Sequence, residues 1–173
     1  MKRSGFKIKP RKPLKRSGFK RKIKLQRDRM PNRVKHAKKE LTLISHTFIR
    51  KRDSINPNTI RGYCFDCGKL GEGRDFQAGH WIPDLVGGAL LRYHPWNMHG
   101  QSGGCNMKFV QERVKINYTL RMIEVYGLTC VNQLKTLKGK SIKVDILFYE
   151  KMIELYKVGD EQKIVDYLHG LAK

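Results

Sequence analysis

The stretch RYHPWNMHGQSGGCN, residues 92–106, concentrates two histidines, two asparagines, a cysteine and three glycines in one short segment. A plain hydrophobic core has no use for so many side chains that bind metals or phosphates, so the segment indicates a functional site. A second cluster lies upstream, with YCFDCG at residues 63–68 and FQAGHWIP at residues 76–83. We expect the fold to bring the two clusters together.

Composition points to a polyanion as the partner. The 173 residues include 37 Lys and Arg against 15 Asp and Glu, a net charge of +22, while a hydrophobic content of 39% allows one modest core. Nucleic acid is the main expectation, and an anionic membrane or a ribosomal scaffold is the less common alternative. No run of about 18 apolar residues is present, which excludes membrane-spanning proteins and predicts a cytoplasmic protein.

Positive charge is concentrated at the N-terminus. Residues 1–39 hold 18 Lys and Arg and a single acid, Asp28, and the sequence KRSGF occurs twice. We expect residues 1–31 to form a basic flexible arm, disordered when free and laid along phosphates when bound. The alternative is a solvated tail that aids solubility or tethers nucleic acid unspecifically. The candidate DNA contacts in the arm are Lys2, Arg3, Lys15, Arg16, Lys20, Arg21 and Lys22.

Apolar periodicity predicts helices on both sides of the two clusters. Residues 32–58 contain a leading helix, and residues 128–173 form a C-terminal helical segment with helices at 129–137 and 144–156 and a short last one from Glu161. Between them, residues 59–127 form the core, and Gly127 ends a helix that follows the second cluster. The fold class is α+β.

The middle of the chain predicts two strands followed by a helix. Residues 76–80 alternate as a strand, residues 90–101 return as the second strand through an extended loop, and Gly103-Gly104 turns into a helix. In this order, a histidine at the end of the first strand faces a side chain on the first helical turn, with a divalent ion and a phosphate between them. We assign His80 as the general base, Asn97 as the residue that pins the loop, and Asn106 as the ligand of Mg²⁺ or Mn²⁺.

Three cysteines have the spacing of a zinc site. Cys64 and Cys67 form a CxxC knuckle whose following glycine relieves a tight turn, and Cys105 lies about forty residues on. Ser102 occupies the fourth position, and a serine hydroxyl is a poor zinc ligand because its proton is hard to remove. The fourth ligand would then be water, His99 or another side chain. The alternative is that the ion is absent and the cysteines are small buried side chains left from a former zinc site.

Other polar residues around the clusters remain open. His99 alternates with Asn97 and Gln101 on one strand face, so it could assist the divalent metal, contact phosphate or complete the zinc site. Arg92 and Lys108 are candidate phosphate contacts at the edge of the site. His46 carries no spacing signal.

The motifs together resemble a known family. CxxC, GHxxP, NxHxQ and CN are similar to the HNH branch of the His-Me finger endonucleases. KPLKR, FIRKRD, CFDCG, FQAGH and RYHPWNMHGQSGGCN resemble the NinG (Rap) recombination proteins of lambdoid phages. Two residues depart from the HNH pattern, since Ser102 replaces a cysteine and Gly79 stands where many HNH enzymes have a metal-binding aspartate.

The resemblance implies a fold, an activity and partners. It implies a small ββα-metal core flanked by helices, and a structure-specific endonuclease that hydrolyses phosphodiesters of Holliday junctions and D-loops with a divalent metal. DNA is then the partner, in the cytoplasm of the host cell, and a homodimer and host or phage recombination proteins remain open as further partners. The alternative function is a non-catalytic basic nucleic-acid-binding module with a degenerate zinc knuckle.

Overall fold

The computed structural model describes residues 18–108 and 112–172, with side chains over residues 32–108 and 114–172. The chain divides into two compact units, Met1–Arg33 and Val34–Lys173, which are described separately. Helix α1 (Gly18–Arg52) begins in the first unit and ends in the second.

The expected disordered arm is helical in part. Because α1 begins at Gly18, residues 18–31 continue the leading helix toward the N-terminus instead of forming flexible chain. Lys, Arg, Leu and Gln are good helix formers, and extending an existing helix avoids the cost of nucleation. The backbone of α1 therefore includes three of the candidate DNA contacts, Lys20, Arg21 and Lys22, whose side chains lie outside the described part of the chain. The other four, Lys2, Arg3, Lys15 and Arg16, lie wholly outside it.

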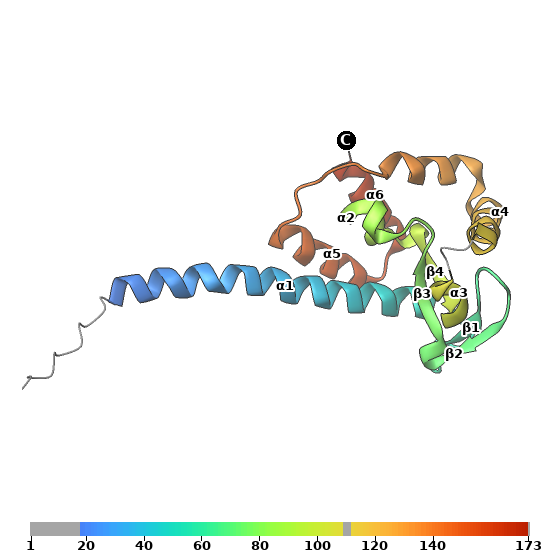
Figure 1. The fold of residues 1–173 in the computed structure, drawn as a ribbon, viewed down its shortest axis with the longest axis horizontal. Coiled ribbons are helices and arrows are strands. Elements are labelled where there is room, and N and C mark those ends of the chain that lie inside the picture. Colours follow the sequence, from blue (N-terminus) through green and yellow to red (C-terminus); the bar gives the residue numbers. More distant parts are fainter. Residues whose placement is uncertain (1–17, 109–111, 173) are drawn as a thin grey trace, which may run out of the picture. The chain divides into compact units, whose positions relative to one another are not determined.

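The second unit combines helices with two small antiparallel sheets, which confirms the α+β class (Figure 1). After α1 its elements are β1 (Arg61–Tyr63), β2 (Leu70–Glu72), β3 (Phe76–His80), α2 (Asp84–Arg92), β4 (Met98–Ser102), α3 (Gly103–Met107), α4 (Glu112–Leu137), α5 (Ile146–Val158) and α6 (Glu161–Leu171).

Strands β3 and β4 carry the two sequence clusters. They pair antiparallel with Phe76 opposite Ser102 and His80 opposite Met98, and α3 follows β4 directly. The predicted first strand and the predicted helix after Gly103-Gly104 are therefore confirmed. Strands β1 and β2 form a separate hairpin around the CxxC turn.

The predicted second strand is wrong over its first residues. Residues 84–92 form α2, and only residues 98–102 form a strand. The pair Gly87-Gly88 does not end the helix pattern, although Gly88 has a left-handed φ of 70° and kinks α2. Leu90 and Leu91 are fully buried in the main core, and this burial stabilises the helical turn that local sequence disfavours.

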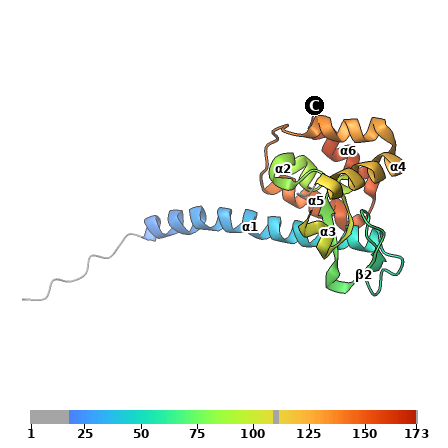
Figure 2. The same ribbon diagram turned by 45° about the vertical axis from the view of Figure 1, so that its right-hand side comes forward.

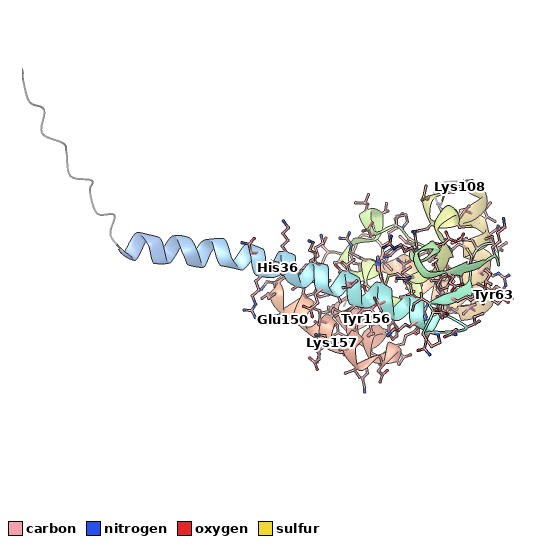
Figure 3. All side chains as sticks on the ribbon, turned by 90° about the horizontal axis from the view of Figure 1, so that it is seen from below. His36, Tyr63, Lys108, Glu150, Tyr156 and Lys157 are labelled. Carbon is pink, nitrogen blue, oxygen red and sulfur yellow. The ribbon has the colours of Figure 1, made fainter. Side chains whose placement is uncertain are left out.

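The main core lies between the C-terminal half of α1 and the later helices. It includes Leu41, Tyr93, Met122 and Met152, all nearly inaccessible to solvent. Helix α5 runs along residues 34–52 of α1, as the labelled Tyr156 and Lys157 show (Figure 3). The ammonium of Lys157 lies 3.0 Å from the carboxylate of Glu40 on α1. Burying a Leu or Met side chain contributes about 1.5–3 kcal/mol.

The C-terminal helices follow their predicted positions. Gly127 interrupts α4 with a φ of 78°, so the predicted break there is confirmed. Asp145 and Asp160 cap α5 and α6 by accepting a hydrogen bond from the backbone N–H three residues on. Helices α2, α4, α5 and α6 gather beside the strands (Figure 2). Within the described ranges, no helix is both long and apolar enough to cross a bilayer.

Candidate active site

Asn97 is a buried structural hub. Its Oδ1 accepts a hydrogen bond from the N–H of Ile82 at 2.9 Å, and its Nδ2 donates to the carbonyls of Ile82 and Leu91, each at 2.9 Å. All four hydrogen-bonding positions of a side-chain amide face the protein here, and three are used. Asn97 therefore ties the chain that leaves β3 to the end of α2, which positions the residues on both sides of it.

His80, the last residue of β3, has a fixed tautomer. Its Nε2 lies 2.9 Å from the carbonyl oxygen of Arg92. A carbonyl only accepts, so Nε2 carries the proton and Nδ1 presents a lone pair. Burial lowers the pKa of His80 below its usual value, more than the Arg92 carbonyl and the nearby Asp84 raise it. The imidazole is therefore neutral near pH 7 and can accept a proton.

His46 stands against His80 and was missed in the sequence. The two rings are 5.9 Å apart, edge to face. Burial, followed by the positive charges of His80 and Arg92, lowers the pKa of His46 to about 4. Burial favours the neutral form of both histidines, and their closeness further disfavours protonation of the two together.

Asn106, on the first turn of α3, faces β3. Its Nδ2 donates to Oε1 of Gln77 at 2.8 Å, and its Oδ1 would lie 2.9 Å from a Cβ placed on Gly79. Gly79 directly precedes His80. The structure thus brings Asn106 to the end of β3, one residue from the histidine that carries the lone pair.

A cationic groove of about 690 Å³ opens beside these residues. Its lining residues are Lys35, Lys38, Lys39, Thr42, Leu43, His46, Thr47, Arg50, Arg74, Gln77, Ala78 and Asn106. Five of these carry positive charge and none is acidic. A groove of this kind favours anions, and Asn106 is part of its lining.

The groove's cations on α1 had a sequence signal. Lys35, Lys38, Lys39 and Thr42 recur at intervals of three and four, which puts them on one helical face. The apolar positions of this helix predicted the helix itself, and its polar positions were not assigned to a site. Arg50 had no such signal, because its guanidinium reaches across to the carbonyls of Phe76 and Gly73.

Cys64, Cys67 and Cys105 form the cysteine cluster. Their three sulfur atoms all lie within 4.8 Å of one another. Gly68 takes a left-handed φ of 67° and donates to the carbonyl of Cys64 at 2.9 Å, which closes the knuckle as expected. Tetrahedral zinc with bonds of about 2.3 Å needs sulfurs about 3.8 Å apart, so small side-chain movements would suffice to hold such an ion.

Ser102 lies at the cluster but has a second task. Its Oγ accepts a hydrogen bond from the N–H of Cys105 at 3.3 Å and caps α3. Burial raises the pKa of Cys67, but hydrogen bonds with the Lys69 amide and the neighbouring thiol and hydroxyl groups lower it below its usual value overall. Burial raises the pKa of Cys105 to about 12. Without a metal, thiolate character therefore gathers on Cys67.

The chain matches a family model described as Bacteriophage Lambda NinG protein over residues 5–163. It belongs to the NinG family. The match covers the cationic groove, the cysteine cluster, β3, β4 and α3, so the whole candidate site lies within the NinG region. No curated protein and no solved structure matches the chain.

His99 does not serve the roles considered for it in this NinG fold. Its Nδ1 lies 3.1 Å from the hydroxyl of Tyr118 and its Nε2 2.8 Å from that of Tyr126, while its ring stacks on Phe65 at 3.9 Å. Binding a metal or phosphate requires a free ring nitrogen, and neither nitrogen is free. Both tyrosines come from α4, which covers this part of β4, so strand alternation alone could not reveal the burial of His99.

The two predicted phosphate contacts outside the arm occupy different settings. Arg92 forms an ion pair with Asp84 across α2, so its charge is already partnered. Lys108 is exposed at the end of α3 (Figure 3) and lines a second hollow of about 400 Å³ beside Cys67 and Cys105. Neither residue lines the cationic groove.

Proposed function

We propose that this NinG-family protein is a metal-dependent DNA endonuclease of the His-Me finger type that cuts branched recombination intermediates. One observation carries the proposal. His80 presents an unprotonated Nδ1 at the end of β3 because the Arg92 carbonyl holds its Nε2, and Asn106 lies against Gly79, the residue before His80, in a groove lined by five cations. This is the combination of base, metal ligand and phosphate site that phosphodiester hydrolysis requires.

The residues divide the chemistry among them. His80 Nδ1 takes a proton from a water molecule, whose oxygen forms the new bond to phosphorus while the bond to the 3′-oxygen breaks. Lys38, Lys39 and Arg50 hold the neighbouring phosphates. Asn106 Oδ1 is the ligand for Mg²⁺ or Mn²⁺, an ion that supplies positive charge to the phosphate oxygens and the leaving 3′-oxygen when bound. Solvent protonates the leaving oxygen.

Support for branched DNA comes from the resemblance to recombination proteins. The groove contacts phosphates, which every DNA shape presents, so its chemistry alone does not select junctions. A homodimer would supply two cutting sites for a symmetric four-way junction, and recombination proteins of the host or phage are further proposed partners.

The cysteine cluster suits a structural zinc ion. Cys64 and Cys67 belong to the β1–β2 hairpin, and Cys105 belongs to α3, so zinc would join the hairpin to the helix that carries Asn106. Three thiols within 4.8 Å match the ligand preference of zinc and not that of magnesium or manganese.

The second candidate function is a non-catalytic nucleic-acid-binding module. Ser102 in the fourth position of the cluster favours it, because a weakened zinc site is typical of a domain that has lost part of its chemistry. Both functions predict tight, salt-sensitive DNA binding.

The test is incubation of the purified full chain with labelled duplex, flap and four-way junction DNA, with and without Mg²⁺ or Mn²⁺. We expect nicks in the junction only when the ion is present. Binding of all three DNAs without cleavage under any condition would overturn the nuclease and leave the binding module.

A further inference from the structure

A chain of side-chain amides with fixed polarity crosses from the groove into the protein. Gln77 donates from Nε2 to the carbonyl of Arg74 at 3.4 Å, so its Oε1 is the acceptor for Asn106 Nδ2 at 2.8 Å. Because the NH₂ group of Asn106 points to Gln77, its Oδ1 lies on the other side of the amide, beside Gly79. The orientation of the Asn106 amide is therefore set by its neighbours.

Gln101, on β4, has the opposite polarity. It is fully buried, and its Nε2 donates to the carboxylate Oδ2 of Asp66. A carboxylate only accepts, so Gln101 Oε1 points away from Asp66. Among the residues that the structure describes, Gln101 Oε1 has no hydrogen-bond donor. A buried acceptor without a partner costs free energy and is rare in folded proteins.

The two amide oxygens converge on one place. A Cβ placed on Gly79 would lie 1.5 Å from Gln101 Oε1 and 2.9 Å from Asn106 Oδ1. Glycine at position 79 leaves this space to the Gln101 oxygen, which a side chain there would displace. Two carbonyl oxygens facing each other repel, and a cation between them turns the repulsion into attraction. Hard divalent cations take amide oxygens as ligands at about 2.0–2.6 Å.

We propose that Gln101 Oε1 and Asn106 Oδ1 together bind the divalent cation, with Asp66 as the positioning residue that turns the Gln101 oxygen toward it. The inference rests on the proposed function for the role of the ion, but its geometry stands on the two amides. Gln101 closes the inner side of the site, and Asn106, which lines the groove, leaves the outer side to water and phosphate oxygens. The site is distinct from the cysteine cluster in ligand chemistry.

The competing arrangement is a flipped Gln101 amide. A protonated Asp66 would donate to Gln101 Oε1, and Nε2 would then donate to Asn106 Oδ1, which leaves no oxygen pair for a cation. The two arrangements differ in what a carboxylate at position 101 would do. The charge-swapped double variant, Gln101→Glu with Asp66→Asn, keeps the hydrogen bond with its direction reversed and aims a carboxylate oxygen at Asn106.

The experiment measures Mn²⁺ binding to the full chain without DNA, by calorimetry and by the electron paramagnetic resonance of bound Mn²⁺, after the thiols have been saturated with zinc. Gln101→Ala should weaken Mn²⁺ binding about tenfold or more, and the double variant should tighten it by at least as much. Gln162→Glu, the same chemical change at an exposed position of α6, is the matched control and should leave the affinity unchanged.

Metal-free melting curves show whether each variant folds. If Gln101→Ala does not fold, the Mn²⁺ affinity of the isosteric double variant decides the question. Unchanged Mn²⁺ affinity in the folded double variant would overturn the proposal. If the double variant still cleaves DNA and its Mn²⁺ affinity is unchanged, the nuclease proposal would remain supported, with Asn106 as the protein ligand of the cation. Mn²⁺ affinity that follows Gln101 in a chain that cuts no DNA would support the cation site and overturn the nuclease instead.

Discussion

The cysteine cluster and the pair of amide oxygens on Gln101 and Asn106, here called the amide pair, are two candidate metal sites with different ligand chemistry. Cys64 and Cys67 sit on one tight turn, and their soft thiol groups have few other uses at that spacing. Gln101 and Asn106 lie on β4 and α3, which follow one another in the sequence. Side-chain amides are common throughout proteins, however, so these residue types alone do not indicate a metal site. The hydrogen bonds donated by the two amide nitrogens fix where Gln101 Oε1 and Asn106 Oδ1 point, and only this orientation reveals the candidate site.

The two candidate sites would have different roles, because the cysteine cluster would stabilise the fold and the amide pair would take part in catalysis. Zinc at the cluster would join the β1–β2 hairpin to α3 and so place Asn106. Mg²⁺ or Mn²⁺ at the amide pair would act on phosphate in the groove. Loss of the first should therefore change stability and metal content, while loss of the second should change catalysis with the fold intact.

The largest expected effect is at His80. His80→Ala removes the lone pair that accepts the proton of water, so cleavage should fall by about 10²- to 10⁴-fold. DNA binding should stay within about twofold, since the groove cations are untouched. Single-turnover cleavage of a four-way junction and fluorescence anisotropy measure the two quantities.

His36→Ala is the control, because His36 is an exposed histidine of α1 that lies outside the groove lining (Figure 3). It should cut at the wild-type rate. If His80→Ala also cuts junctions at that rate, the base has been assigned to the wrong residue.

The second effect sharpens the contrast between groove and arm. Replacing Lys38 and Lys39 together with alanine should weaken binding to duplex, flap and junction alike, and lower the slope of log affinity against log salt by about 0.9 for each phosphate that the protein no longer neutralises. Deleting residues 1–30 should lower the slope further, because that segment carries more cations. Titrations over a salt series measure both slopes.

Lys151→Ala provides the control for charge, since Lys151 is a lysine of α5 outside the groove lining and pairs with Glu154. An unchanged slope after Lys38 and Lys39 are replaced would show that the groove does not hold DNA. An unchanged slope after the deletion would reduce the arm to a solubility element.

Local spacing predicted a large part of the fold around the candidate site. His80 and Asn106 were placed by the strand–strand–helix order, and Cys64 with Cys67 by the knuckle, since each motif is formed by residues close in sequence. His46 was missed because its importance comes from a ring contact with a residue 34 positions away. Such contacts depend on how elements pack, which periodicity within one element does not contain.

Two errors have the same origin. The Gly87-Gly88 pair suggested a loop, but burial of the leucines that follow it stabilises α2. His99 suggested a ligand, but tyrosines from α4 occupy both ring nitrogens. For α2, tertiary burial outweighed a local preference of about 1 kcal/mol or less per residue, and for His99 it brought partners from a distant helix.

A third prediction concerns the cysteine cluster. Ser102→Cys supplies the fourth thiol, so zinc content should rise from below one ion per chain toward one, and the melting temperature should rise by several degrees. A hundredfold excess of zinc over its dissociation constant adds about 2.7 kcal/mol to the free energy of unfolding. Elemental mass spectrometry and calorimetry measure content and stability.

Loss of the Ser102 cap on α3 works against this gain by about 1 kcal/mol, so the metal-free variant should melt slightly below the wild type. Cys130→Ser, a thiol change outside the cluster, should alter zinc content in neither direction. Zinc missing from both wild type and Ser102→Cys would mean that packing alone shapes the turn.

The smallest expected effect is a displaced pH profile, and it separates the two sites by their protons. Burial lowers the pKa of His80, so the base remains neutral as pH falls through the ordinary histidine value of about 6.5, and kcat/KM should decline only below that pH. Zinc is also released as pH falls, but burial raises the pKa of Cys105 to about 12, so protons compete with zinc for this ligand at higher pH. Measuring kcat/KM and bound zinc on the same samples from about pH 4.5 to 8 distinguishes them. A fall in kcat/KM that has its midpoint below about 6.5 and does not coincide with zinc release assigns the decline to His80, whereas a midpoint above about 7 would contradict a buried neutral base.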